Sequence, residues 1–589
     1  SAMENTLALA ALFNIPFSID WLMELSREKV SHLLQALDYG VAQGWLAGEG
    51  AGRYRDIAAA ARQGLRDARA ADEVGGDGGG RASRTALRRQ AVAILMRELA
   101  DGPEKAMAVA DLLLELDNDL EGCRQLVAAG DSFRRRYESL AALRYYEKAL
   151  ADLGRLASGE TADQLLTTAT LNYAKLFTAT ADADRVLTAL KEAIAVAADH
   201  GWTARWSLLK MHLAKQLWTG SRHASALTHF NEAWAVRGEI QDDGYRRSAR
   251  VFGMYFLFWQ GRFQEAVASY EAHLPEISEP PADTFPLMAL ITIGICYVHC
   301  GQMAKGVGML EALREACVRR GNLTMAAHAL LNIGLSCSET GRLEESLVHF
   351  ETALAYGRES HDLLVEIAAL LGMVYYHFKH SQPRSTLDYL QRFRALSKDA
   401  HMGVRNVPVV MELCWAMETG RLPTVDGFEL EKEIAQSLRN RSVYMRGMAY
   451  LYRARLRKRR REAAMRVVKD IRKAVDLLSD AGHRLHLAIA ELDLAREWFE
   501  AGREDEAREL AGPAAQYLLE NNSALVPEDL HPLLRHLRTE KNLLTEMMAL
   551  SRDLVSLEAA GDLVGKVLSA AGRLTGAERG AIFTCEADP

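Results

Sequence analysis

Apolar residues recur three or four positions apart over most of the chain, from about Leu87 to about Asn521. This spacing places them along one face of a helix, so the sequence predicts helix after helix in this region. Small residues mark a regular step of 40 residues within it. They are Ser221, Gly261, Gly301, Gly341 and Ser381. Each is expected to be the same turn between two helices, and a fixed period of this length predicts stacked helix pairs, an α-solenoid.

The two helices of each predicted pair carry different signatures. The first contains Ile293-Gly294, followed by Tyr297, and in the next unit Ile333-Gly334. The second contains small and aromatic residues at helical spacing: Ala226, Phe230 and Ala233; Ala266 and Tyr270; Ser346, Phe350 and Ala353. These patterns resemble tetratricopeptide repeats, and the longer helices resemble those of maltose-activator-type STAND regulators. The resemblance implies a superhelix over residues 95–525, although the period exceeds the usual ~34 residues and the closing proline is absent.

A small unit precedes the array at residues 4–56. Three short helices are expected there, followed by a hairpin near Gly44–Tyr54, and this order resembles the winged helix that follows the ATPase core in STAND proteins. Winged helices also read DNA, but the third helix carries only Lys29 and His32 as basic residues. Nucleic acid is therefore not expected as a partner. Residues 57–94 are expected to be a helix and a Gly-rich linker; no Gly-Lys-Ser/Thr follows, so this is not a phosphate loop.

The chain changes character after the array. Residues 526–560 are expected to form a connecting helix with an apolar stripe of Leu543, Met547, Leu550, Leu554 and Leu557. This stripe allows a homodimer through Leu543–Leu557. Residues 561–589 resemble the opening of a GAF domain, which implies a piece of a longer protein. The expected fold class is all-α: a tetratricopeptide-like α-solenoid superhelix with an N-terminal winged-helix unit and a C-terminal connecting helix.

The composition argues against some partners and locations. The 589 residues are 49% apolar and 25% charged, with a net charge of −7, which argues against nucleic acid as a global partner. Seven cysteines are scattered and no signal peptide is seen, so a reducing, cytoplasmic location is expected. The longest apolar run, Phe285–Cys300, is too short and too mixed to span a bilayer, so no membrane contact is expected.

No motif for catalysis or cofactor binding is found. Phosphate loops, His-Glu-x-x-His, Gly-x-Ser-x-Gly and Cys-x-x-Cys are all missing from the sequence. Cys296, His299 and Cys300 share one helix, but a closed zinc site needs four ligands and no second cluster matches. They are therefore interpreted as packing residues. No enzyme activity, cofactor or metal is expected.

The candidate binding site follows from the repeat register. The first helix of each tetratricopeptide pair lines the concave groove, and projecting the 40-residue step gives an aromatic inner wall. Its predicted members are Trp218, Tyr255, Phe258, Trp259, Ile295, His299, Leu335, Tyr375 and Phe378. Such a wall suits an apolar peptide, an amphipathic helix or a flat small ligand. The alternative is that these residues pack on one another as core.

A basic run forms the second candidate surface. Lys458, Arg459, Arg460 and Arg461 follow one another, and further basic residues flank them. A run of this kind is either a solvated turn between helices or a docking patch for an acidic partner.

Together these features predict a non-enzymatic regulatory scaffold of a bacterial signalling or transcription-regulating protein. The groove would bind a protein or peptide partner and relay its presence to a C-terminal GAF or output domain. Two alternatives stay open from the sequence: a small-molecule inducer sensor of the maltose-activator type, and an autoinhibitory or self-assembly module that contacts the parent protein's own ATPase or output domains.

Overall fold

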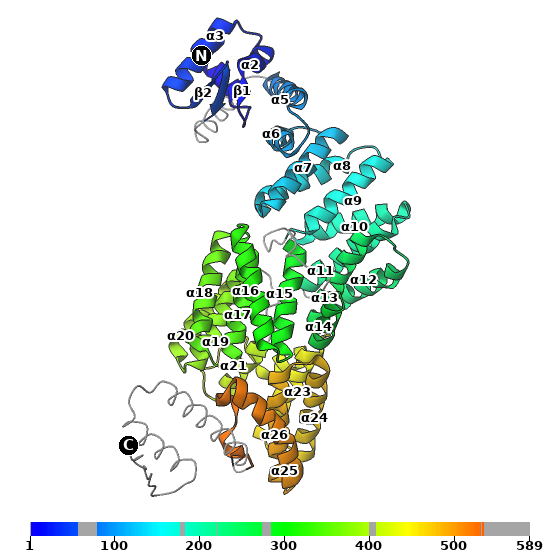
Figure 1. Ribbon diagram of the computed structural model, residues 1–589, viewed down its shortest axis with the longest axis vertical. Helices are drawn as coiled ribbons and strands as arrows, with labels where there is room; N and C mark the ends of the chain where they lie inside the picture. The colour runs from blue at the N-terminus through cyan, green and yellow to red at the C-terminus, as the bar shows by residue number, and fades with distance from the viewer. Residues whose placement is uncertain are drawn as a thin grey trace, which may run out of the picture.

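The computed structural model describes residues 2–56, 79–176, 183–220, 222–273, 284–399, 408–531 and 533–534. Helices dominate it, and they stack along an elongated, curving path from the N-terminal unit at one end (Figure 1). The predicted fold class, an all-α tetratricopeptide-like solenoid, is confirmed. Three predicted features lie outside the described residues: the Gly-rich linker, the apolar stripe at Leu543–Leu557 and the GAF-like residues 561–589.

The N-terminal unit combines three helices with a small antiparallel sheet. Its elements are α1 (Ala2–Ala10), β1 (Phe17–Ser18), α2 (Ile19–Ser26), α3 (Val30–Ala42), β2 (Leu46–Gly50) and β3 (Arg53–Asp56), with strand order β1-β3-β2. The sequence indicated the hairpin but not β1, whose Phe17 pairs with Tyr54. Phe17 is fully buried and stacks on Phe13 at 5.6 Å, which closes the core of the unit. Its interpretation as a winged helix stays a prediction.

The helical array begins with α5 and continues to the end of the described chain. Its first part contains α5 (Gly79–Glu98), α6 (Pro103–Leu113), α7 (Leu120–Arg135), α8 (Ser139–Leu153), α9 (Glu160–Ala174), α10 (Ala183–Asp199), α11 (Thr203–Thr219), α12 (His223–Ala235), η1 (Val236–Gly238), α13 (Asp243–Trp259) and α14 (Phe263–Glu271). Its second part contains α15 (Thr284–His299), α16 (Met303–Arg319), α17 (Leu323–Glu339), α18 (Leu343–Glu359), α19 (Leu363–Lys379), α20 (Pro383–Asp399), α21 (Pro408–Glu418), α22 (Leu430–Leu438), α23 (Val443–Arg459), α24 (Ala464–Ala481), α25 (Arg484–Glu500), α26 (Glu504–Asn521), η3 (Ser523–Leu525) and η4 (Glu528–Leu530).

Helix length explains the 40-residue period. Helices α16 to α20 each span 17 residues and short turns separate them, so one helix pair consumes 40 positions. The predicted turn residues Gly261, Gly301 and Gly341 have φ of 68°, 84° and 75°, the left-handed conformation that ends a helix. Ser381 adopts the same conformation at φ 54° without being glycine. Ser221 lies outside the described residues.

The opposite helix ends follow the same register. Asn322, Asp362 and Ser442 are buried, and each accepts a hydrogen bond from a backbone N–H in the first turn of the helix that it caps. Asp242 caps α13 in the same way. These caps are separated by multiples of 40 residues. The residues that begin the helices therefore repeat with the same period as the residues that end them.

The small and aromatic residues of the repeat signature fit one another. Phe350 of α18 is 1% exposed, and its ring lies where a Cβ at Gly334 or Gly372 would come within 2.7 Å of it. Glycine at both positions therefore lets α17 and α19 approach the same ring. Ala226, Ala266 and Ser346 are fully buried at matching positions of α12, α14 and α18.

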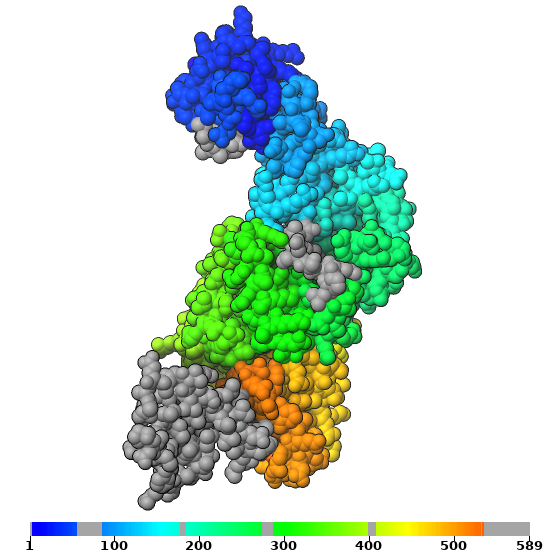
Figure 2. All heavy atoms as spheres, in the orientation of Figure 1, coloured from blue at the N-terminus to red at the C-terminus, as the bar shows by residue number. Residues whose placement is uncertain are grey.

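The superhelix closes on itself. The turns at Gly261, Gly301 and Gly341 face residues about 180 positions later, at Ser442, Arg484 and Asn522. Two hydrogen bonds join the two levels: Val443 N–H donates to the Gln260 carbonyl at 2.8 Å, and the Asn522 amide donates to the Glu339 carbonyl at 2.9 Å. We call this contact line the seam. Along it, the start of α25 and the end of α26 meet the turns that follow α15 and α17 (Figures 1 and 2).

Two further observations bear on the sequence expectations. In the part of the chain that the structure describes, no helix is long and apolar enough to cross a bilayer. Six cysteines, Cys123, Cys296, Cys300, Cys317, Cys337 and Cys414, are free thiols, and most of them are buried between helices.

Candidate functional site

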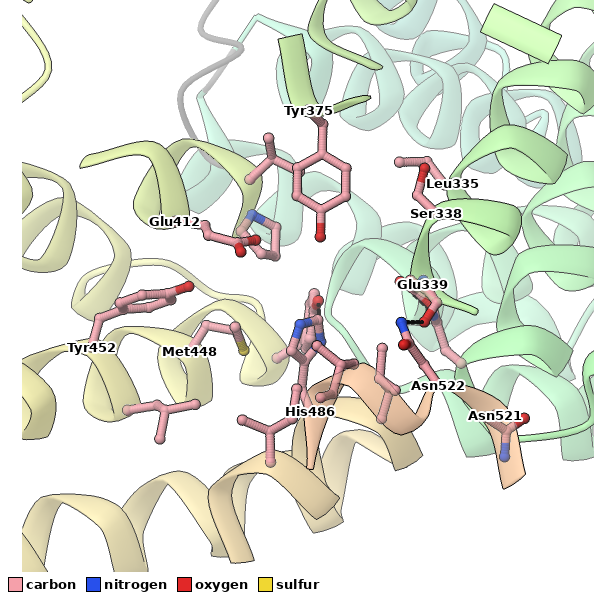
Figure 3. A pocket seen from close by; sticks show the side chains of 18 of the residues that line it. Leu335, Ser338, Glu339, Tyr375, Glu412, Met448, Tyr452, His486, Asn521 and Asn522 are labelled. Atoms are coloured by element: carbon pink, nitrogen blue, oxygen red, sulfur yellow. Dashed lines mark hydrogen bonds and ion pairs between the residues drawn. The ribbon is translucent and has the colours of Figure 1, made fainter. Parts of the chain in front are cut away.

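Closure of the superhelix leaves a cavity of about 1280 Å³ inside it. Residues of α13–α15 and α17–α19 form one wall, residues of α21 and α23–α25 form the other, and residues 519–527 cover one end. The side chains therefore come from two levels of the array that meet at the seam. Figure 3 shows this interior, with Leu335 and Tyr375 on one side and Met448 and Tyr452 on the other.

Six of the nine predicted groove residues line this cavity. They are Phe258, Trp259, Ile295, His299, Leu335 and Tyr375. Trp259 is 41% exposed, which is unusual for an indole and leaves a large apolar face open. Phe258 packs edge-on against it at 5.3 Å, so the two rings support each other at the wall. Their role in binding stays a prediction.

The other three predicted residues lie elsewhere, and the expectation that they face the groove is wrong. Trp218 and Tyr255 are only 4% and 3% exposed. The Trp218 ring packs edge-on against Phe256 at 5.8 Å, in the core between α11 and α13. Phe378 is half-buried outside the cavity lining, with the Arg421 guanidinium 5.7 Å from its ring centroid. Tight helix packing makes Trp218 and Tyr255 part of the core, which is the alternative that the sequence left open.

The opposite wall was not predicted from the sequence. Tyr444, Met448, Tyr452 and His486 line the cavity from α23 and α25, and Asn522 does so from the chain after α26. A signal for them exists: Ser442, Gly482 and Asn522 repeat the 40-residue step of Gly261, Gly301 and Gly341.

Two tyrosines supply polar groups to the interior. Burial, with Glu412 nearby, raises the pKa of both Tyr375 and Tyr452 well above its ordinary value. Both phenols are therefore neutral hydrogen-bonding groups at physiological pH. The Tyr375 hydroxyl points into the cavity, toward the level of His486 and Glu339 (Figure 3).

Most charged groups at the cavity are already paired within the chain. Lys379 binds Glu412, Lys458 binds Glu497 at 2.5 Å, and the Asp493 carboxylate accepts from Arg455 and Arg496 at 2.8 Å each. These pairs cancel one another's charge, so the lining is polar without a strong net field. An occupant is then held by its shape, apolar surface and hydrogen bonds more than by its charge.

The basic run at Lys458–Arg461 is partly neutralised in the same way. Lys458 also reaches Glu500 at 2.8 Å, and Arg460 pairs with Glu431. Arg459 and Arg461 are exposed where α23 ends. A docking role for this run stays a prediction, with about half of its charge engaged inside the protein.

A cluster of three histidines and a glutamate lies at the seam. His299 ends α15, Glu339 ends α17, and His483 and His486 begin α25. The His299 and His483 rings stack at 4.3 Å, and His483 Nε2 lies 3.3 Å from His486 Nδ1. Burial lowers the pKa of His299 and of His486 to about 3 and raises the pKa of Glu339 to about 8. The cluster is therefore largely uncharged near neutral pH.

Comparisons with known proteins give structural likenesses only. No protein-family model matches the chain, and no curated protein matches it. A STAND protein with a tetratricopeptide repeat sensor from Pyrococcus horikoshii aligns over 87% of the chain at 12% identity, with a TM-score of 0.39. A Rap protein complexed with Competence and Sporulation Factor aligns over 69% of this chain and 99% of its own, at 12% identity and a TM-score of 0.41.

The apo form of the quorum sensor NprR from B. thuringiensis aligns over 68% of this chain and 99% of its own length, at 14% identity and a TM-score of 0.31. Our chain spans 65% of the length of the STAND protein.

Proposed function

We propose that the chain is a non-enzymatic regulatory scaffold whose superhelix binds a segment of a peptide or protein partner in its interior. The observation that carries the proposal is the large cavity inside the superhelix, with Trp259 open at its wall. Buried aromatic anchors in such pockets dominate the binding energy of protein interfaces.

The size and chemistry of the cavity favour a peptide over a small molecule. Its volume of about 1280 Å³ exceeds the range of roughly 300–1,000 Å³ that is common for small-ligand sites. Asn332 and Asn521 line it, and each donates one amide hydrogen to a backbone carbonyl of its own helix. The remaining hydrogen-bonding capacity of such amides suits a peptide backbone.

The position of the cavity supports a relay to the C-terminal side of the chain. Residues 519–527, which cover one end, lead directly into the predicted connecting segment 526–560. An occupant that binds more tightly to one position of this cover than to another shifts the equilibrium between them. We propose that this shift is the regulatory output, in a cytoplasmic signalling protein.

The proposal is tested with a random peptide library displayed on phage and selected against the purified chain. We expect selected peptides to bind Trp259→Ala more weakly by about 2 kcal/mol or more, as loss of a buried aromatic anchor does. Tyr39→Ala is the matched control, because Tyr39 is 44% exposed but lies in the N-terminal unit. Failure to select any peptide, together with stabilisation by a small metabolite, would instead favour an inducer sensor.

A further inference from the structure

The cluster at the seam has the composition of a metal site. One nitrogen each of His299 and His483 and one carboxylate oxygen of Glu339 all lie within 4.8 Å of one another. His299 Nδ1 is 4.0 Å and His483 Nε2 is 3.9 Å from Glu339 Oε1. Two imidazoles and one carboxylate form a ligand set that zinc accepts in proteins. We propose that His299, Glu339 and His483 bind a divalent transition-metal ion of the zinc type.

A buried histidine nitrogen without a hydrogen bond supports the proposal independently of the distances between the ligand atoms. His299 Nδ1 is buried and makes no hydrogen bond within the described residues, although it faces Glu339. An unpaired buried nitrogen costs free energy in the folded state. A metal ion placed between these groups would satisfy the nitrogen and the carboxylate together.

Binding requires the three ligand atoms to move closer together, and the stacked His299 and His483 rings to turn so that both nitrogens point at the ion. Bonds of about 2.0–2.2 Å to tetrahedral zinc place neighbouring ligand atoms a little over 3 Å apart, compared with 3.9 and 4.0 Å here. His483 Nδ1 accepts a long, 3.4 Å bond from the His486 N–H, so its ring proton lies on Nε2. Metal binding at Nε2 moves that proton to Nδ1, and it ends both this weak bond and the 3.3 Å contact of Nε2 with His486 Nδ1.

The cavity supplies an entry path and an open coordination position. His299 and Glu339 line the cavity, whereas His483 lies fully buried behind them. Three protein ligands leave a fourth position for water or for an atom of the cavity's occupant. His299 and Glu339 come from one level of the superhelix and His483 from the next, so the ion would link the two levels at the seam.

Titration of the purified chain with ZnCl₂, followed by calorimetry and by the thermal unfolding midpoint, tests the site. We expect one ion per chain and a rise in the midpoint, because a ligand that binds only the folded state stabilises it. Mg²⁺, which prefers oxygen ligands in an octahedron, should give neither effect. With Co²⁺ in place of zinc, a visible absorption band of a four- or five-coordinate ion should appear.

Glu339→Gln and His299→Gln are expected to weaken zinc binding by about 100-fold or more, beyond the 10–100-fold typical of groups that only orient ligands. Glu339→Gln keeps the size of the side chain, so folding should survive it. Glu412→Gln is the matched control, since Glu412 lines the same cavity but pairs with Lys379. It should leave zinc affinity unchanged.

Three results would overturn the proposal: no zinc binding at micromolar concentrations, binding that survives both ligand substitutions, or equal loss in the Glu412 control. Hydrogen exchange keeps the test decisive if a substitution disturbs folding. In the unaltered chain, zinc should slow exchange at the ends of α15 and α17 and at the start of α25. Slowing confined to other helices would contradict the assignment.

Discussion

The Asn522 amide donates a hydrogen bond to the backbone carbonyl of Glu339, 183 residues earlier, at 2.9 Å. This bond joins the chain after α26 to the end of α17. It belongs to the seam, where the turns at Gly261, Gly301 and Gly341 meet residues about 180 positions later, at the starts of α23 and α25 and at the end of α26. Without this closure the inner wall of the repeats would be an open groove, and the cavity would have only one side.

The seam predicts that two chemically identical substitutions differ in cost. A Cβ at Gly261 would lie 2.5 Å from Ser442 Oγ and 2.7 Å from the Tyr444 backbone nitrogen, whereas one at Gly321 would meet nothing within 4 Å. Both glycines have positive φ, 68° and 73°, so both alanine variants carry a backbone strain of about 1–2 kcal/mol. Gly261→Ala adds overpacking, worth about 1–3 kcal/mol more.

Urea denaturation measures this difference. We expect Gly261→Ala to lower the free energy of unfolding clearly more than Gly321→Ala does. Equal losses would show that the two levels of the superhelix do not touch at Gly261.

A buried charge junction beside the cavity gives the second prediction. Asp493, with 11% of its side chain exposed, accepts hydrogen bonds from Arg455 and Arg496. Asp493→Ala leaves the Arg455 guanidinium, 27% exposed, without this partner, so we expect a loss of about 2–3 kcal/mol. Glu506→Ala removes one half of the exposed Arg503 pair and should destabilise the protein clearly less, because solvent screens an exposed ion pair. Thermal unfolding of both variants separates the cases; similar midpoints would mean that Asp493 is solvated.

Buried histidines predict a dependence of stability on pH. Burial lowers the pKa of His212 and of His328 below the ordinary value of 6.5. The unfolded chain therefore binds protons first as the pH falls, and the free energy of unfolding decreases below about pH 6.5. Above that pH the full contribution is present. Each such histidine adds at most about 1.4 kcal/mol per pH unit to the slope.

Denaturant titrations at about pH 7.5 and about pH 5 test this sign. His328→Asn should reduce the loss of stability between the two conditions. His32→Gln, on an exposed position of α3, controls for the removal of a histidine as such. An equal change of stability between the two conditions in His328→Asn and in the unaltered chain would contradict the burial argument.

The sequence predicted the repeat better than it predicted the site. Gly261, Gly301, Gly341 and Ser381 are the expected turns, because a left-handed residue after each helix leaves a local signature. Whether an aromatic side chain faces the cavity or packs in the core depends on the curvature of the superhelix, which no local sequence pattern indicates. Trp259 is open and Trp218 is buried, although one register placed both on the inner wall.

The second wall of the cavity was missed for a related reason. Tyr444 and His486 reach the site through a contact about 180 residues along the chain, set by the pitch of the superhelix. Interruptions at Pro408, Pro423 and Gly427 also hide the resumption of the register in the sequence. The zinc-type cluster was missed because its ligands lie on three separate helices, whereas the sequence pattern pointed to neighbours of His299 on α15.

Photo-crosslinking of a selected peptide tests the central claim, binding inside the superhelix, most directly. A benzophenone carried by the peptide reacts with whatever side chains surround it, and mass spectrometry of the digest identifies them. We predict crosslinks within α13, α17, α19 and α23, which line the cavity, and their loss in Trp259→Ala at the same peptide concentration. Crosslinks confined to α16, α20 or α22, which contribute no residue to the cavity, or undiminished in Trp259→Ala, would show that the partner binds elsewhere.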